Sequence, residues 1–121
     1  APEQLGELLD PVPDLGLHLD IGHANLLVPA NSAEAILKRF GSRLRHVHLH
    51  DNKGGSADLH LPLGAGTIDL DWTVRILQSA QYDSTITLEV FTPDREYLRY
   101  SADILRKAWS RGMAAQEARG A

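Results

Sequence analysis

The fold is decided by a stretch in which apolar and polar side chains alternate, Arg45-His46-Val47-His48-Leu49-His50-Asp51. This period of two is typical of a β-strand, whose successive side chains point to opposite faces. The apolar Val47 and Leu49 therefore share one face, opposite three histidines: His46, His48 and His50. Because a buried imidazole needs a hydrogen-bond partner or a metal ion, the stretch predicts a strand between a core and a polar site.

Two further segments alternate in the same way. Residues 15–20 (LGLHLD) place Asp20 at the end of a polar face, and residues 85–91 (TITLEVF) place Glu89 on one. The segments before, between and after these strands have apolar residues at helical spacing, which predicts four helices. They span residues 2–9, about 33 to 40, Asp69 or Asp71 to just before Tyr82, and about 94 onward. The tail after residue 112 is expected to be frayed. This alternation of helices and strands predicts parallel strands joined by right-handed crossovers.

The predicted topology brings three polar side chains to one end of the sheet. If the helices cover the apolar face, the polar face stays open, and in a barrel it becomes the interior, with the site at the carboxyl ends of the strands. Asp20, His48 and Glu89 fall near those ends, one on each strand. We therefore predict that these three residues converge.

One aspartate, one histidine and one glutamate form a mixed oxygen and nitrogen donor set, which suits Mn²⁺, Zn²⁺, Co²⁺ or Fe²⁺. Such an ion polarises a carbonyl or phosphoryl oxygen or generates a hydroxide, and a glutamate beside it can move a proton at carbon next to a carbonyl. The alternative is an ion-pair network that only satisfies itself.

A second group of candidate ligands lies in loops. Residues 52–68 form a loop too long for a simple connection, and loops of this length are usually functional. Asp58 and His60 point the same way in an extended segment and could form a second site with His23. The remaining histidines are expected to play other roles: His18 and His46 as interior polar residues or as partners that support the metal ligands, and His50 as a candidate substrate contact.

Composition narrows the class of protein. The 121 residues correspond to a single domain, and 43% hydrophobic residues suit a globular chain. The chain has no cysteine, so any metal must be held by His, Asp, Glu and water. A net charge of −4 without a block of Lys and Arg argues against nucleic-acid binding. We find no signal peptide and no apolar run that could span a membrane, so we expect a cytoplasmic protein without a membrane partner.

Four segments together resemble the xylose isomerase-like TIM-barrel superfamily, which includes sugar and sugar-phosphate isomerases and epimerases and the family 2 AP endonucleases. They are residues 19–23 (LDIGH), 46–53 (HVHLHDNK), 58–69 (DLHLPLGAGTID) and 86–90 (ITLEV). The resemblance covers most of the chain in the right order. It implies an α/β fold, a partial (β/α)8 barrel of about three parallel strands from the C-terminal part of the barrel.

The resemblance also implies roles for individual residues. Asp20, His48 and Glu89 match metal ligands on the last three barrel strands. In the isomerases, the residue matching His23 meets the substrate, and the glutamate matching Glu89 is one of a pair that shuttles a proton at a sugar carbon. In the endonucleases, the positions matching His23, Asp58 and His60 hold an additional zinc ion.

Two activities are therefore open at this stage. The three residues of the additional zinc site favour a metal-dependent AP endonuclease-like phosphodiesterase. The run at residues 60–64, the pair Ile68-Asp69 and the acidic balance are more typical of the sugar isomerases, although Ala65 replaces a glutamate often found between the two glycines. The leading prediction is a metal-dependent isomerase or epimerase of a small sugar or sugar phosphate.

Length sets a further expectation. A complete barrel has eight strands, and an earlier strand would carry another glutamate that is both a ligand and the partner acid/base. We therefore expect the 121 residues to form the C-terminal portion of an enzyme, with an incomplete active site when isolated. The folded form is expected to be a homo-oligomer or to need the missing strands, because exposed sheet edges invite pairing. A third possibility is a truncated fragment or metal-binding scaffold without catalysis.

Overall fold

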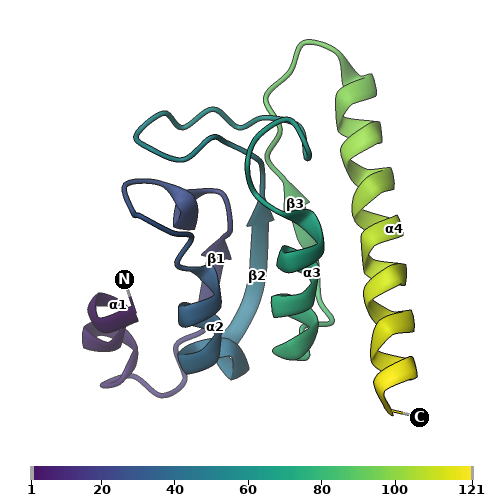
Figure 1. Cartoon of the computed structure of the whole chain (residues 1–121). Coiled ribbons are helices and arrows are strands. Elements are labelled where there is room, and N and C mark those ends of the chain that lie inside the picture. The colour runs from purple at the N-terminus through teal and green to yellow at the C-terminus, as the bar shows by residue number, and fades with distance from the viewer. Residues whose placement is uncertain (1, 121) are drawn as a thin grey trace.

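A computed structural model describes residues 2–120. Helices and strands alternate as predicted and form an α/β unit with one parallel three-stranded sheet, in the order β1-β2-β3 (Figure 1). The elements are, in chain order, α1 (Pro2–Leu9), β1 (Leu17–Asp20), the 3-10 turn η1 (His23–Asn25), α2 (Ala33–Phe40), the 3-10 turn η2 (Gly41–Arg43), β2 (Leu44–Leu49), α3 (Leu70–Ser79), β3 (Ile86–Leu88) and α4 (Arg95–Gly120).

The register of the sheet aligns the ends of the three strands. His48 of β2 lies opposite Asp20 of β1 and opposite Thr87 of β3. Beyond the assigned end of β3, the N–H of Glu89 still donates to the carbonyl of Leu49, at 2.9 Å. The residues at the carboxyl end of each strand thus lie side by side, which is the arrangement that the alternation predicted.

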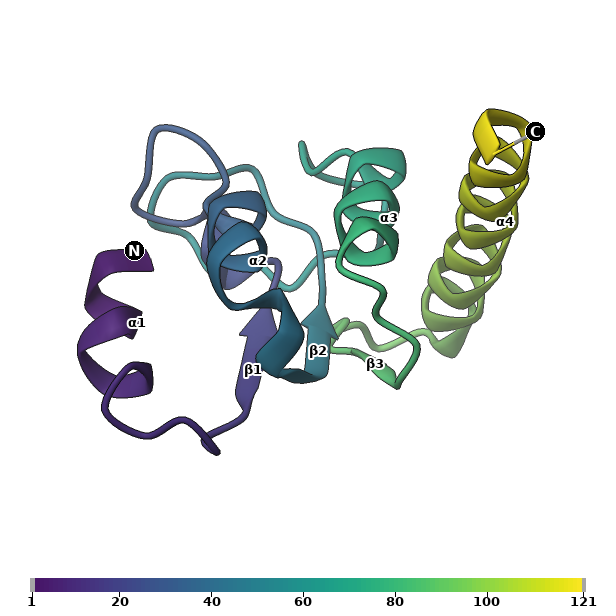
Figure 2. The ribbon, with the colours of Figure 1, turned by 90° about the horizontal axis from the view of Figure 1, so that it is seen from below.

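The apolar face of the sheet is covered by helices, and Figure 2 shows α2 and α3 on one side of the strands. Strand residues such as Leu19, Val47 and Leu49 are almost completely buried there, and they join one core with side chains of α2 and α3, among them Ile36, Leu37, Phe40, Ile76 and Leu77. The histidine-bearing face lies on the other side and stays open. This separation follows from the period-two pattern of each strand.

The last helix corrects two expectations. The tail after Gly112 is helical to Gly120 rather than frayed, because α4 packs along α3. The side chain of Gln78 in α3 donates to the carbonyl of Trp109 at 3.0 Å. Gly112 lies so close to Gln78 that a Cβ at this position would be 2.2 Å from Oε1 of Gln78. The helical spacing of apolar residues in this segment also predicts that Tyr97 packs against the core, but Tyr97 is exposed, because the first turns of α4 extend beyond the sheet.

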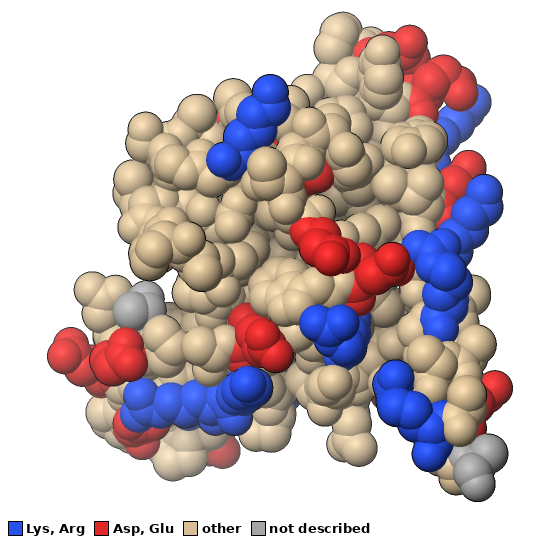
Figure 3. Space-filling model, viewed as in Figure 1, with Lys and Arg blue, Asp and Glu red and all other residues tan. Residues whose placement is uncertain are grey.

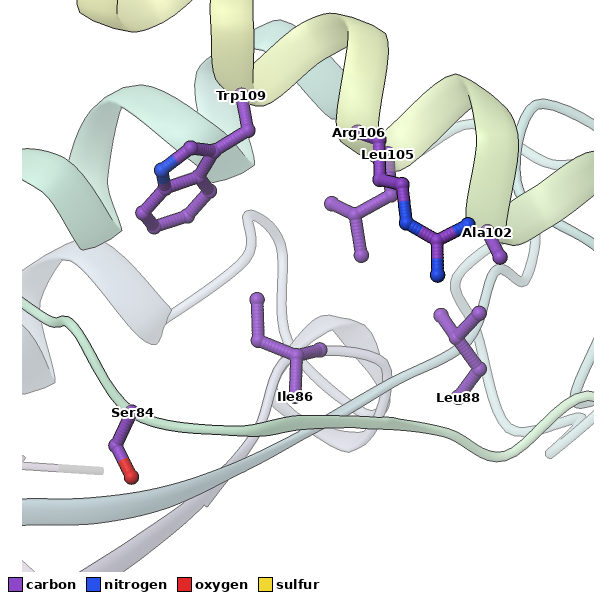
Figure 4. Close-up of a pocket in the computed structure, with 7 residues that line it drawn as sticks. All are labelled: Ser84, Ile86, Leu88, Ala102, Leu105, Arg106 and Trp109. Carbon is purple, nitrogen blue, oxygen red and sulfur yellow. The ribbon is translucent and has the colours of Figure 1, made fainter.

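An open apolar pocket of about 410 Å³ lies between β3 and α4 (Figure 4). Ile86 and Leu88 of β3 face Leu105 and Trp109 of α4 across it. Within residues 2–120, the outer edge of β3 has no strand partner. In the same part of the chain, no helix is long and apolar enough to cross a membrane.

Candidate metal centre

The carboxyl ends of the three strands bring together Asp20, His48 and Glu89, as the sequence predicted. One donor atom from each lies within 4.8 Å of the others. Nδ1 of His48 is 2.7 Å from Oε1 of Glu89, and all three side chains are partly exposed on the open face of the sheet. The group therefore combines converging donors with access from solvent.

A second group lies beside the first and contains His23, His50, Asp58 and His60, again with donor atoms within 4.8 Å of one another. Asp58 stands between two of the imidazoles: its Oδ2 is 2.9 Å from Nε2 of His23, and its Oδ1 is 3.0 Å from Nε2 of His60. The ring of His50 stacks on that of His60, with 3.9 Å between centroids and 21° between planes. The predicted second cluster thus forms, with one additional histidine.

Asp20 connects the two groups. Its Oδ2 lies 3.0 Å from Nδ1 of His23, and its Oδ1 lies 3.1 Å from Nε2 of His50. The N–H of His23 also donates to Oδ1, at 2.8 Å, and this contact fixes the turn that follows β1. A cation bound to either group would therefore act on the other through Asp20.

A hydrogen-bond hub holds the long loop that carries Asp58 and His60. The carboxylate of Asp51 is buried and accepts four backbone N–H groups, those of Asn52, Gly64, Gly66 and Ile68, at 2.8–3.1 Å. The backbone of Asp51 pairs with that of Leu61 in both directions, at 2.8 and 2.9 Å. Because the second half of the loop is fixed to the end of β2, Asp58 and His60 are positioned against the strand ends.

The neighbouring Asn52 fixes the turn η1 to the same strand end. Its Nδ2 donates to the carbonyl of Gly22 at 2.8 Å, and its Oδ1 accepts from Nδ2 of Asn25 at 2.8 Å. His23 lies between Gly22 and Asn25 and is therefore held by both ends of η1. The sequence motif that follows the third histidine of β2 thus positions the loops around the site.

The donor chemistry of the second group fits a divalent cation. Nδ1 of His60 is 2.8 Å from the carbonyl oxygen of Glu89, which can only accept, so we assign the ring proton to Nδ1. Nε2 of His60 then turns a lone pair toward the carboxylate of Asp58. His23 faces carboxylates with both ring nitrogens, although a neutral imidazole carries one proton. Each such contact requires an added proton or a metal ion between the two groups.

Electrostatics within the cluster act in the same direction. Burial opposes the charged form of Asp20, but the imidazole of His50 and the N–H of His23 outweigh it and hold the pKa of Asp20 below 3.8. Burial likewise opposes the charged form of His50, and the Asp20 carboxylate raises its pKa above 6.5. The pKa of Asp58 is lowered against a small burial effect, chiefly by His23. The carboxylates thus remain ionised and attract cations.

The other histidines depart from the positions expected of them. His18 is exposed rather than interior, and His46 is half-buried, with its two ring nitrogens 3.0 Å from the hydroxyls of Thr85 and Thr87. The expectation that His50 contacts substrate is wrong, because its side chain is completely buried. Alternation placed His50 on the correct face, but it could not show that the chain at Gly22 covers that ring.

The family model for the xylose isomerase-like TIM barrel matches residues 1–108. The chain therefore belongs to this family, and the partial barrel expected from its motifs is confirmed. A crystal structure of a D-tagatose 3-epimerase-like protein superimposes with a TM-score of 0.76 and 31% sequence identity, over 95% of this chain and 43% of that one.

Among curated relatives, an uncharacterised protein of Methanocaldococcus jannaschii is 38% identical over 93 residues, which is 74% of this chain and 31% of that protein. An uncharacterised protein of Sinorhizobium fredii is 28% identical over 103 residues, covering 85% of this chain and 32% of that protein. The chain thus spans about a third of the length of these relatives.

Proposed function

We propose that the chain forms part of a metal-dependent isomerase or epimerase that acts on a sugar or sugar phosphate. The observation that carries this proposal is the convergence of Asp20, His48 and Glu89 from the ends of three neighbouring parallel strands. Membership of the xylose isomerase-like family and the likeness to an epimerase-like structure support it. The site lies at the end of the strands where TIM-barrel enzymes place their chemistry.

In this proposal, Asp20, His48 and Glu89 would hold a divalent ion, which would supply positive charge beside the oxygen of the substrate carbonyl. Glu89 removes the proton from the adjacent carbon. Its Oε1 is 2.7 Å from Nδ1 of His48, whereas its Oε2 is 4.0 Å from Nδ1 of His60. The two oxygens can therefore divide the tasks of holding the ion and accepting the proton. The partly exposed His23 orients the substrate.

The return of a proton to the opposite face needs a second acid/base, which we place in the part of the barrel that precedes β1.

The sheet has free edges at β1 and β3 within the described residues. We propose that the 121 residues are one structural unit, the C-terminal portion of a barrel, and that either further strands or another copy cover those edges. A monodisperse monomer in light scattering at micromolar concentration would argue against the second copy.

Exchange of a carbon-bound proton with solvent tests the proposed function, because this half-reaction needs only one base. The chain is loaded with Mn²⁺ and incubated with D-tagatose or D-fructose in D₂O, and NMR follows the loss of the proton signal beside the carbonyl. Exchange that is lost in Glu89→Gln and retained in Glu96→Gln, an exposed glutamate of α4, would support the proposal. No exchange by metal-loaded protein, or exchange that survives Glu89→Gln, would refute it.

The group of His23, Asp58 and His60 favours a second candidate, an AP endonuclease-like phosphodiesterase. Figure 3 shows blue and red side chains interspersed over the helix-covered face, and the whole sequence has a net charge of −4 without a block of Lys and Arg. A phosphodiester-binding site is usually accompanied by a basic surface. Cleavage of an abasic-site duplex by the metal-loaded chain, without exchange on ketoses, would favour this candidate. Metal binding with neither activity would favour a scaffold.

A further inference from the structure

We propose that His60 is a positioning residue, which fixes Glu89 at the end of β3 so that the carboxylate of Glu89 faces the open site. The inference rests on the proposed function and deepens it, because it gives a task to a loop residue that lies outside the three strands. His60 would act through the backbone of Glu89 and would touch neither the substrate nor the reacting atoms.

Glu89 lies beyond the assigned end of β3, where the sheet gives its backbone a single partner. Its N–H donates to the carbonyl of Leu49 at 2.9 Å, and β2 itself ends at Leu49. Within residues 2–120, the outer edge of β3 has no strand partner. The sheet alone therefore fixes the backbone of Glu89 by one hydrogen bond.

His60 supplies two hydrogen bonds that the sheet does not. Its Nδ1–H donates to the carbonyl of Glu89 at 2.8 Å, and its own backbone carbonyl accepts the N–H of Phe91 at 3.0 Å. These two contacts continue the strand past its assigned end. His60 is itself anchored, because the backbone of the next residue, Leu61, pairs with that of Asp51 in both directions. Through His60, the residue that carries the proposed base is tied to the hub at Asp51.

The ring of His60 is held in one orientation. It is buried between two other rings, that of His50 with centroids 3.9 Å apart and planes at 21°, and that of Phe91 at 4.1 Å and 10°. The stack keeps Nδ1 directed at the carbonyl of Glu89. The same Nδ1 is 4.0 Å from Oε2 of Glu89, which is too far for a hydrogen bond, so this carboxylate oxygen stays free to accept a proton.

The backbone of His60 is strained at the same place. Its φ of 49° lies in the left-handed region, which few residues other than glycine adopt, although Asn, Asp and His do so more often than the rest. Such conformations persist only where the surrounding structure holds them, and they cluster at functional sites. Here the ring stack and the hydrogen bonds to residues 89 and 91 hold it. Strain, stacking and hydrogen bonding thus all act on the end of β3.

The main rival is that His60 acts through Nε2, which lies 3.0 Å from Oδ1 of Asp58 and could bind an ion there. Two substitutions of equal size separate the explanations. In His60→Asn, the side-chain NH₂ takes the place of Nδ1, so the donor to Glu89 is kept while Nε2 is removed. In His60→Asp, an acceptor takes that place and faces the carbonyl. Asn and Asp both tolerate a left-handed backbone, so the pair is matched.

Exchange of the carbon-bound proton of D-fructose with D₂O, on Mn²⁺-loaded protein, measures the effect on the base. At saturating ketose, we expect His60→Asn to stay within about threefold of the wild type and His60→Asp to be about 10–100-fold slower, because a small displacement of a catalytic group has effects of this size. The ketose concentration that gives half the maximal rate should be the same in both variants, since His60 does not touch the substrate.

A second measurement does not depend on catalysis. NMR follows the exchange of the Phe91 N–H with D₂O in metal-free protein, and this exchange should be at least about tenfold faster in His60→Asp than in His60→Asn, because the carbonyl of Glu89 has lost its donor. The N–H of Val47 in the middle of β2 is the control and should not change. Circular dichroism checks folding, and His60→Gln, whose amide reaches the place of Nε2 and not that of Nδ1, replaces His60→Asp if the latter unfolds.

Two results would overturn the inference. Equal loss of ketose exchange in His60→Asn and His60→Asp, with equal protection of the Phe91 N–H, would assign the role of His60 to Nε2. Full activity in both would show that Glu89 needs no such donor. A wild type that exchanges no proton on ketoses would refute the proposed function. In that case the Phe91 N–H still decides whether His60 fixes the end of β3, and equal exchange in the two variants would show that it does not.

Discussion

Replacement of Asp51 by Asn tests the hub that fixes the ligand-bearing loop. The substitution keeps the shape of the side chain but replaces one acceptor oxygen with an NH₂ donor. Oδ2 accepts from Gly64 and Gly66, each at 3.0 Å, and Oδ1 accepts from Asn52 and Ile68, at 2.8 and 3.1 Å. Whichever way the new amide turns, two backbone N–H groups lose their acceptor.

The cost can be worked out from those two groups. A buried donor left without an acceptor costs about 1–3 kcal/mol, so two cost about 2–6 kcal/mol. Gly64 is exposed and Gly66 is partly exposed, so water can reach their N–H groups in part. We therefore expect Asp51→Asn to lower the free energy of unfolding by about 2–4 kcal/mol, a large share of the about 5–15 kcal/mol typical of a domain.

Urea unfolding followed by circular dichroism at 222 nm measures this difference on metal-free protein. The matched control is Asp83→Asn, which makes the same chemical change at an exposed position between α3 and β3 and should stay within about 0.5 kcal/mol of the wild type. If Asp51→Asn also stays within that range, Asp51 does not hold the loop in the way described.

Three further predictions concern neighbouring contacts. Gly22→Ala should destabilise the chain by about 1–3 kcal/mol in urea unfolding, because the added Cβ would overlap the buried ring of His50; unchanged stability would show that the ring can move. Ser101→Ala should cost about 1–2 kcal/mol by the same measurement, since its hydroxyl accepts the N–H of Leu63 at 3.0 Å in a buried position. In metal-free protein kept in a chelator, the free energy of unfolding should fall as the pH rises from 6 to 8. The pKa of His50 is raised above 6.5 in the folded chain, so its protonation adds stability. This stability is fully present below pH 6.5 and is lost as the pH rises through the folded-state pKa. A pH dependence equally large in His50→Gln would assign the effect to other groups.

Local patterns in the sequence predicted most of the fold. The strand that carries His48 was found from alternation alone, and Asp69 accepts from the N–H of Trp72 at the start of α3, as one of the two predicted caps. Strand ends were less accurate: β3 is limited to Ile86–Leu88, where a longer segment alternates. A pattern of apolar residues records which face is buried, but strand length depends on the neighbour that supplies hydrogen bonds.

The site could be predicted as far as each residue depends on its own strand. Asp20, His48 and Glu89 were brought together by the period of two and the parallel order. The position of His50 depends on Gly22, which is distant in the sequence, and on the close approach of two backbones. Similarly, the alternation gave no sign that Asp51 would hold the loop, because four N–H groups from later residues define that role.

The hub at Asp51 has a consequence for how such a site diversifies. It fixes the chain on either side of the tip at residues 53–57 without using any side chain of that tip, and most of those residues are exposed. Mutations can therefore accumulate at Lys53, Ser56 and Ala57 while Asp58 and His60 keep their positions, whereas Gly54 and Gly55 have positive φ angles that favour glycine. A lineage can alter the rim of the site without rebuilding its ligands, and directed evolution of substrate range would begin at those three positions.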